Sequence, residues 1–280
     1  MPVSGEPVRL GLIGDAIAQS RAPSMHERAG ALIGLDVRYD RLVPAELGAS
    51  FEDVVSRARE NGYRGLNITY PYKERVVPLV SVEDLRVARL GAVNTVLFEP
   101  DGPRGYNTDY SGFLAAYRRG RGKAPAGAVC MVGAGGVGRA VAFGLLELGV
   151  TRLRLVDTDR ARSRQLAGEL RTSAPHVDID VSIDVADGAR GADGLINCTP
   201  LGMVGHDGTP IPRGLMTGAA WVFDAVYTPP RTLFLRDAEA LGLTIMSGVE
   251  LFFYQGLHAF SLFHGRDLDE ADLRTLLDIA

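Results

Sequence analysis

The fold of this chain is decided by the stretch Val129-Cys130-Met131-Val132-Gly133-Ala134-Gly135-Gly136-Val137-Gly138. Its four leading apolar residues predict a buried strand, and the run 139–148 predicts a helix. In a strand–turn–helix unit, Gly-x-Gly-x-x-Gly allows a tight turn, close backbone approach to a pyrophosphate and close helix–strand packing. The helix N-terminus then offers N–H groups to that pyrophosphate. The loop 133–138 is therefore the expected dinucleotide site, and an ordinary tight turn is the alternative.

A second apolar strand, 153–156, ends at Asp157, close to the expected ~20 residues after the loop. A carboxylate there binds a free ribose 2′-OH and repels a 2′-phosphate, which favours NAD over NADP. Arg160, Arg162 and Arg164 follow, and an arginine in that place can clamp a phosphate. A solvated helix face is the simpler interpretation of the three arginines.

The composition is that of a globular protein, with 280 residues, 46% hydrophobic and 23% charged residues and a net charge of −4. No basic stripe suggests nucleic acid or an acidic membrane, and no apolar run approaches the ~18 residues of a membrane span. The N-terminal residues lack the pattern of a signal peptide. Cys130 and Cys198 lie in apolar runs, which suits reduced thiols and a cytoplasmic protein. We expect no metal, because cysteine and histidine show no ligand spacing.

Strands alternate with helices along the whole chain, which predicts an α/β protein with mostly parallel sheets. In the first half, we expect strands at 8–13, 37–42, 65–69 and 91–98, helices at 23–32, 47–61 and 110–119, and a helical turn opened by Pro71. A glycine- and proline-rich joint follows at 120–127. In the second half, we expect strands at 129–132, 153–157, 177–182, 193–198, 221–226 and near 243–245, and helices at 138–148, 161–171, near 184–190 and at 250–264.

Three segments with different tasks follow from this order. Residues 1–120 are expected to form an α/β substrate-binding and catalytic domain, and residues 121–248 a Rossmann domain that binds NAD(P). Residues 249–280 are expected to form helices that pack back toward the substrate domain.

The segment Asn67-Ile68-Thr69-Tyr70-Pro71-Tyr72-Lys73 carries the sharpest local anomaly. If Pro71 occupies the first helical position, Lys73 lies in the first turn, where the helix dipole disfavours a cation. A lysine whose charged form is disfavoured suits proton transfer, whereas a solvent-facing lysine is the plain alternative. A structural interpretation is also available for the neighbouring polar residues. Asp109 is then a helix N-cap, and Asn67, Thr69 and Asn94 are strand or turn residues. Polar residues that end successive strands nevertheless favour a cleft for a polyol.

The chain resembles shikimate dehydrogenases and the related quinate/shikimate dehydrogenases from about Leu10 to Gly265. The matching motifs are Gly14–Ser20, Asn67–Lys73, Gly91–Thr95, Asn107–Gly112, Gly133–Gly138, Asn197–Met203, Val226–Pro229 and Gln255 with Ala259-Phe260. The resemblance implies reversible oxidation of shikimate to 3-dehydroshikimate, or of quinate to 3-dehydroquinate, by hydride transfer to NAD, with NADP possible. It thereby places the chain in the shikimate pathway, which makes chorismate and the aromatic amino acids.

The resemblance also implies a role for each matching residue. Lys73 and Asp109 correspond to the catalytic pair that handles the hydroxyl proton. The substrate, a cyclic polyol carboxylate, would be held by Ser20, Asn67, Thr69, Asn94, Tyr227 and Gln255. The cofactor would contact Gly133, Ala134, Gly135, Gly136, Val137, Gly138, Asp157, Arg160, Thr199, Met203, Val226 and Gly248.

One departure from the family concerns the substrate carboxylate. The family usually reads Ser-x-Ser-Pro or Ser-x-Thr-Pro, whereas this chain reads Ser20-Arg21-Ala22-Pro23 and so lacks the second hydroxyl. A hydrogen bond to a carboxylate is worth about 1.5–3 kcal/mol. Ser24 or Arg21 are candidates to compensate. The loss therefore leaves open an aminoshikimate-type substrate, and a non-catalytic ligand sensor is a further alternative. The sequence is compatible with a monomer or a homodimer.

Overall fold

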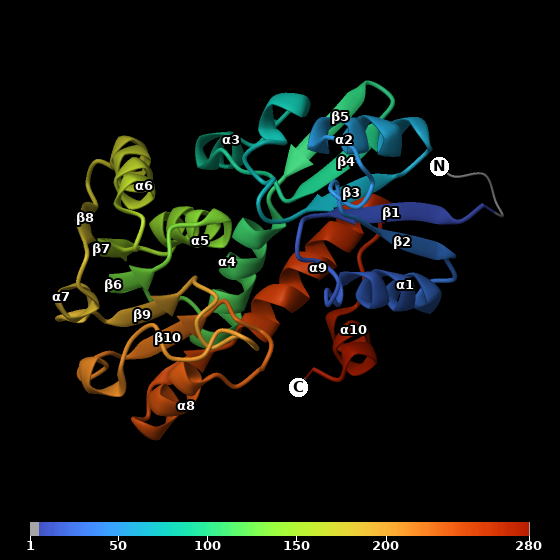
Figure 1. Cartoon of the computed structure of the whole chain (residues 1–280). Helices are drawn as coiled ribbons and strands as arrows, with labels where there is room; N and C mark the ends of the chain where they lie inside the picture. Colours follow the sequence, from blue (N-terminus) through green and yellow to red (C-terminus); the bar gives the residue numbers. More distant parts are fainter. Residues whose placement is uncertain (1–5, 280) are drawn as a thin grey trace. The chain divides into compact units, whose positions relative to one another are not determined.

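The computed structural model describes residues 6–279, which form two compact units (Figure 1). Unit 1 comprises Met1–Thr108 and Gln255–Ala280, and unit 2 comprises Asp109–Tyr254. The boundaries fall inside the helices α4 (Thr108–Arg121) and α9 (Gly248–His264), and the glycine-rich segment 120–127 belongs to unit 2. Among the described residues, no helix is long and apolar enough to cross a membrane.

Unit 1 is built on a five-stranded sheet in the order β2-β1-β3-β4-β5. The strands β1 (Val8–Ile13), β2 (Val37–Leu42) and β3 (Gly65–Ile68) are parallel to one another. The strands β4 (Thr95–Glu99) and β5 (Gly102–Tyr106) are antiparallel to their neighbours. The helices of the unit are α1 (Ala22–Leu32), α2 (Phe51–Glu60), α3 (Leu85–Leu90), the 3-10 helix η1 (Val77–Leu79), α10 (Glu270–Leu277) and the second half of α9.

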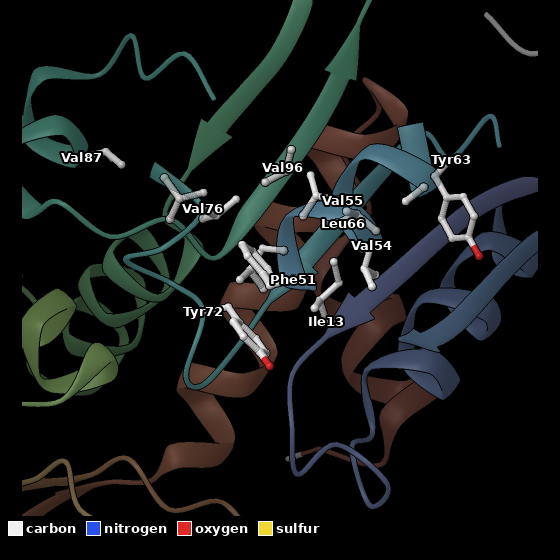
Figure 2. Close-up of a cluster of buried hydrophobic side chains, with 13 residues drawn as sticks. Ile13, Phe51, Val54, Val55, Tyr63, Leu66, Tyr72, Val76, Val87 and Val96 are labelled. Carbon is white, nitrogen blue, oxygen red and sulfur yellow. The ribbon is translucent and has the colours of Figure 1, made fainter. Parts of the chain in front are cut away.

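Each face of this sheet carries its own apolar cluster, because side chains alternate along a strand. One face packs against α2, where Ile13, Leu66 and Val96 meet Phe51 and Val54 (Figure 2). The other face packs against α1 and α9 through a cluster formed by Val8, Leu10, Leu12, Ile17, Ala22, Val37, Tyr39, Leu97, Ala259 and Phe263. The alternation places neighbouring residues of one strand in different surroundings.

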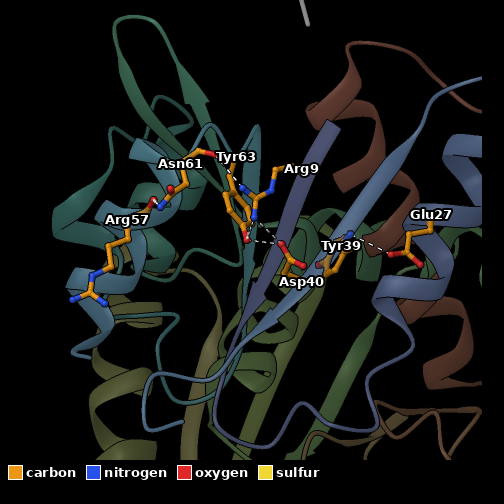
Figure 3. Close-up of polar contacts among 7 residues, drawn as sticks. All are labelled: Arg9, Glu27, Tyr39, Asp40, Arg57, Asn61 and Tyr63. Carbon is orange, nitrogen blue, oxygen red and sulfur yellow. Dashed lines mark hydrogen bonds and ion pairs between the residues drawn. The ribbon is translucent and has the colours of Figure 1, made fainter. Parts of the chain in front are cut away.

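The edge strand β2 shows this alternation most clearly (Figure 3). The Tyr39 ring stacks on His26 of α1, with 5.1 Å between ring centroids. The next residue, Asp40, bonds on the opposite face with Arg9 and Tyr63. Figure 3 also shows the Tyr39 N–H donating to Glu27 of α1. Odd-numbered positions of β2 therefore face α1.

Unit 2 contains a six-stranded, fully parallel sheet in the order β11-β10-β9-β6-β7-β8. Its strands are β6 (Gly127–Val132), β7 (Val150–Val156), β8 (Asp178–Ser182), β9 (Gly194–Asn197), β10 (Trp221–Asp224) and β11 (Thr244–Met246). Its helices are α4, α5 (Gly136–Glu147), α6 (Arg160–Ser173), α7 (Val185–Ala189), α8 (Leu233–Ala240), the 3-10 helix η2 (Arg213–Leu215) and the first half of α9. This doubly wound order confirms the predicted Rossmann fold and the α/β class.

The structure corrects two local predictions in unit 1. The strand expected at 91–98 begins only at Thr95, because the buried residues before it lie in a loop. After Pro71 the chain forms a single helical turn and no α-helix: the Val76 N–H donates to the Tyr72 carbonyl, whereas the Lys73 carbonyl accepts from the Val93 N–H. Because one turn lacks the aligned peptide dipoles of a helix, the helix-dipole argument for Lys73 does not apply.

Candidate active site

Two asparagines at strand ends of unit 1 are joined by a buried hydrogen-bond network. The Tyr39 hydroxyl donates to Oδ1 of Asn67 at 2.7 Å, and Nδ2 of Asn67 donates to Oγ1 of Thr95 at 3.0 Å. Thr95 in turn donates to Oδ1 of Asn94 at 3.0 Å, and the same oxygen accepts the Thr108 N–H at 2.6 Å. These bonds fix the orientation of both side-chain amides. The Oδ1 of Asn94 already accepts hydrogen bonds from Thr95 and Thr108, so its amide N–H groups are the donors that can bind a ligand.

Lys73 lies in the turn that follows β3 and is only 8% exposed. The alternative of a solvent-facing lysine is therefore wrong. Thr69, at the start of the same turn, is held by its N–H on the Ile13 carbonyl and accepts the Tyr72 N–H. The segment 67–73 thus contains an oriented amide, a hydroxyl and a buried amine at the end of β3 and in the turn that follows it.

Ser20 lies in the loop between β1 and α1, and its Oγ accepts the Ala22 N–H at 3.3 Å. Ala22 is the first residue of α1 and is buried in the apolar cluster on that face of the sheet. Ser24 lies two residues further along α1 and is exposed.

Gln255 lies on the stripe of α9 that faces the unit 1 sheet, since it is followed at four-residue steps by Ala259 and Phe263 of the apolar cluster. Phe263 lies against the start of β3, where a Cβ on Gly65 would be 2.5 Å from its ring. Two turns of helix, about 12 Å, carry Gln255 away from that point. A Cβ on the next residue, Gly256, would lie 2.2 Å from Met25 near the start of α1, which places Gln255 toward the carboxyl ends of β1 and β3.

The glycine loop of unit 2 has the geometry that a pyrophosphate needs. Gly133 has φ of 101°, and a Cβ on Gly138 would lie 2.1 Å from the Gly133 carbonyl oxygen. These two glycines make the turn and the close helix–strand approach. At Gly135, the N-cap of α5, a Cβ would meet no atom within 4 Å. The open space in front of Gly135 and the start of α5 therefore fits a dinucleotide phosphate.

Asp157 follows β7 and is bonded to the glycine loop. Its Oδ2 accepts the Ala134 N–H at 2.7 Å, and its Oδ1 accepts the Asp159 N–H at 2.8 Å. Arg160 is the exposed first residue of α6, whereas Arg162 pairs with Asp159 at 3.5 Å. The carboxylate thus anchors the glycine loop, and its contact with a ribose stays a prediction.

A second buried network joins the ends of β9 and β10. The Asp224 carboxylate accepts hydrogen bonds from Asn197 at 2.9 Å, from Thr232 at 2.5 Å and from the Val226 N–H at 3.0 Å. Burial raises the pKa of Asp224, while these three donors oppose the rise. Asn197 also accepts the Thr199 hydroxyl at 2.7 Å. The network shapes the two loops that contain the cofactor candidates Thr199 and Val226.

Three further candidates lie near these loops of unit 2. Met203 is partly exposed in the loop after β9. Tyr227 stacks on Phe252, with 5.0 Å between ring centroids. A Cβ on Gly248 would lie 2.5 Å from the carbonyl oxygens of both Ala225 and Val226, so only glycine lets α9 start so close to this backbone.

Asp109 is buried in the first turn of α4, which begins at Thr108, so its interpretation as an N-cap is wrong. Burial, together with the charges of Asp224 and Asp109, raises the pKa of the Cys198 thiol. This places the Asp109 carboxylate near the end of β9. Lys73 belongs to unit 1 and Asp109 to unit 2, and their catalytic pairing stays a prediction.

Sequence reasoning missed Tyr39 and Thr95 of the first network, and Asp224 and Thr232 of the second. The alternation in 37–42 indicated a buried Tyr39, but its partner Asn67 is 28 residues away and only the sheet register brings them together. Among the described residues, no cluster of histidine, cysteine, aspartate or glutamate could hold a metal ion.

Comparisons with known proteins agree with this architecture. The model of the shikimate dehydrogenase substrate-binding domain matches residues 12–96. The quinate/shikimate dehydrogenase (NAD(+)) of Corynebacterium efficiens is 40% identical over 95% of this chain and 96% of its own length. The shikimate dehydrogenase (NADP(+)) of an Arthrobacter species is 39% identical over 95% of this chain and 92% of its own length.

Among solved structures, quinate dehydrogenase from Corynebacterium glutamicum in complex with NAD superimposes with a TM-score of 0.90. It is 36% identical and covers 97% of this chain and 98% of its own. The similarity spans both units. The chain therefore belongs to the family of quinate/shikimate dehydrogenases.

Proposed function

We propose that this protein is an NAD-preferring dehydrogenase that reversibly oxidises a secondary hydroxyl of quinate, of shikimate or of both. Unit 1 would bind the cyclic polyol carboxylate, and unit 2 the dinucleotide. The observation that carries the proposal is the burial of Lys73 in the turn after β3. This turn follows the strand that contains the hydrogen-bonded amide of Asn67. Relatives at about 40% identity with this activity in their names support it.

In this proposal, Lys73 exchanges a proton with the oxygen of the hydroxyl that is oxidised. Asp109 orients and stabilises that group, and Asn67, Thr69, Asn94 and Gln255 hold the ring hydroxyls. Ser20 binds the carboxylate, with Tyr227 as a further substrate contact. The nicotinamide, when bound, supplies the hydride chemistry, whereas the protein supplies position and proton transfer.

The preference for NAD rests on Asp157. Its carboxylate would accept a hydrogen bond from a free 2′-OH and repel a 2′-phosphate. The glycine loop 133–138 would hold the pyrophosphate, with Arg160 at the adenosine end. Thr199, Met203, Val226 and Gly248 would surround the nicotinamide.

Initial-rate kinetics with quinate and shikimate, each with NAD and NADP, test the proposal. The expected result is the highest kcat/KM with NAD and one or both acids. A higher kcat/KM with NADP would contradict the cofactor assignment. No turnover in the four combinations, with NAD binding retained, would contradict the dehydrogenase assignment for these acids and favour an aminoshikimate-type substrate or a ligand sensor.

We further propose that the protein works in the cytoplasm as a monomer or a homodimer. The free thiols of Cys130 and Cys198 suit a reducing compartment. Light scattering on the purified protein measures the oligomeric state, and a mass above that of a dimer would contradict it.

A further inference from the structure

The end of unit 1 that would take the substrate carboxylate has one hydroxyl fewer than the family pattern. The missing hydroxyl is that of residue 22. In this protein Ala22 is 9% exposed and packs in the apolar cluster with Ile17 and Leu12. Its N–H is bonded to the Ser20 hydroxyl. A second group for the carboxylate must therefore come from another element.

Arg41 reaches this place from the neighbouring strand. Its Nη2 donates to the Ser20 carbonyl oxygen at 2.9 Å. In the sheet, Leu12 pairs with Arg41 on one side and with Asn67 on the other. Residues in register share a face, so Arg41 and Asn67 project from the same face, with roots about 10 Å apart across two strand spacings.

The alternation of β2 confirms which face this is. Tyr39, two residues before Arg41, packs on His26 of α1, whereas Asp40 bonds on the far face (Figure 3). The Arg41 charge also reaches the Tyr39 hydroxyl: burial raises the pKa of that phenol, and Arg41 opposes the rise. The guanidinium thus lies between the Ser20 loop and the Tyr39–Asn67 hydrogen bond.

The guanidinium has capacity for a ligand. It is exposed and carries five N–H donors. Within residues 6–279, the Ser20 carbonyl is its hydrogen-bond partner, and no carboxylate lies within ion-pair distance of it. The bond to the Ser20 carbonyl holds one end of the guanidinium at this loop, and the remaining N–H groups can bind a carboxylate in a bidentate way.

We propose that Arg41 is a specificity-determining residue whose guanidinium binds the substrate carboxylate beside Ser20, in place of the hydroxyl that Ala22 lacks. This inference rests on the proposed function, because it takes Ser20 as the carboxylate end of the site. It goes further by naming the group that makes a negative charge at that end favourable. A substrate without the charge would lose that contact.

The test compares quinate with its uncharged methyl ester in the wild type and in R41Q. Loss of a charge-assisted contact is expected to lower kcat/KM for quinate by about 10- to 100-fold. The same variant should change kcat/KM for the ester by no more than about twofold, because the ester carries no charge for Arg41 to meet. R38Q is the matched control: Arg38 is exposed on the same strand but projects from the opposite face, so both substrates should be unaffected.

A second variant separates binding from loop structure. R41K keeps the positive charge at this place and should retain part of the kcat/KM for quinate that R41Q loses, with the ester again unaffected. An equal loss for acid and ester in R41Q would overturn the inference and leave Arg41 as a support of the Ser20 loop. An unchanged kcat/KM for quinate would overturn it as well.

Thermal stabilisation by the same two compounds gives a readout that needs no turnover. Quinate should raise the Tm of the wild type more than the ester does, and R41Q should abolish the difference. A wild-type protein that is stabilised by quinate but turns over neither acid contradicts the proposed activity and leaves the Arg41 assignment intact. A wild type that does not distinguish acid from ester contradicts Arg41 alone.

Discussion

Lys73 and Lys123 are the two lysines among 30 basic side chains, and their environments differ completely. Lys73 is buried behind β3, whereas Lys123 is exposed in the segment before β6. Arginine stays protonated at any pH that proteins tolerate, so it cannot give and take a proton as an amine does. A lysine kept in a buried turn of such an arginine-rich chain suits proton transfer.

The variant K73R tests this difference directly. It keeps a positive charge but cannot become neutral to accept a proton, and we expect kcat to fall by about 10²- to 10⁴-fold, the usual contribution of general acid–base catalysis. K123R, the control, should keep wild-type kinetics. Steady-state rates with quinate and NAD measure both, and NAD binding by fluorescence should be unchanged. Activity of K73R within a few-fold of the wild type would remove Lys73 from proton transfer.

The Tyr39–Asn67 bond offers a second test at single-residue resolution. Y39F leaves the buried Asn67 carbonyl without its donor, and an unsatisfied buried acceptor costs about 1–3 kcal/mol. We expect the free energy of unfolding to drop by that amount in urea titrations. Y70F removes a hydroxyl from a side chain that is 74% exposed and should have no measurable effect. Equal stability of Y39F and Y70F would show that the bond does not hold the amide.

Single residues show where sequence reasoning stops. Asn67, Thr69 and Lys73 were predicted as candidates because their contiguous motif matches the family pattern. Arg41 carries no such signal, because an arginine in an alternating edge strand reads as solvated surface. Its relation to Ser20 depends on the pairing of β1 with β2, which the residues around it do not encode.

At the scale of elements, the strand–loop–helix around 129–148 follows closely from its sequence, because each glycine has a separate local task. G135A and G138A distinguish these tasks. Alanine at 135 points into the open space of the predicted pyrophosphate site, so we expect weaker NAD binding, by roughly tenfold or more, with an unchanged Tm.

Alanine at 138 would collide with the Gly133 carbonyl, and we expect a lower Tm even without cofactor. Calorimetric titration with NAD and thermal unfolding measure both variants. An unchanged Kd for NAD in G135A would mean that the pyrophosphate does not approach this part of the loop.

Elements without a strong apolar pattern were harder to predict. The strand β5, Gly-Pro-Arg-Gly-Tyr, contains two glycines and a proline and looks like a turn, yet it pairs along its length with β4. It forms a strand because its antiparallel neighbour supplies backbone hydrogen-bond partners. Local residue propensities carry no information about such a neighbour. The 91–94 segment shows the reverse case, in which apolar residues are buried in a loop.

At the scale of the whole molecule, stability should depend on pH through a buried histidine of unit 1. His26 is 1% exposed, stacks on Tyr39 and Phe260, and faces His264 of α9. Burial, helped by the charge of His264, lowers the pKa of His26 from 6.5 to about 3. The folded protein therefore keeps His26 neutral where the unfolded chain binds a proton.

The sign of the effect follows from that difference. The contribution of His26 to the free energy of unfolding is fully present above pH 6.5. It is lost as the pH falls toward 3, by about 1.4 kcal/mol per pH unit. Burial also lowers the pKa of His264 to about 4 and that of His258, so urea titrations between pH 7 and 5 should show a steeper slope than this in the wild type and a shallower one in H26F. H176Q, which removes an exposed histidine, serves as the control and should keep the wild-type slope. Parallel slopes in wild type and H26F would exclude His26 as the cause.

The two bonds of Asp157 have a consequence for how cofactor preference can evolve. One carboxylate both faces the expected ribose and holds the Ala134 N–H of the glycine loop. A substitution that admits a 2′-phosphate therefore keeps the loop in place only where the new side chain still accepts this N–H, as the Oδ1 of asparagine does. We expect descendants that change to NADP to replace this aspartate with asparagine, because a side chain without an acceptor would release the loop on which every dinucleotide depends.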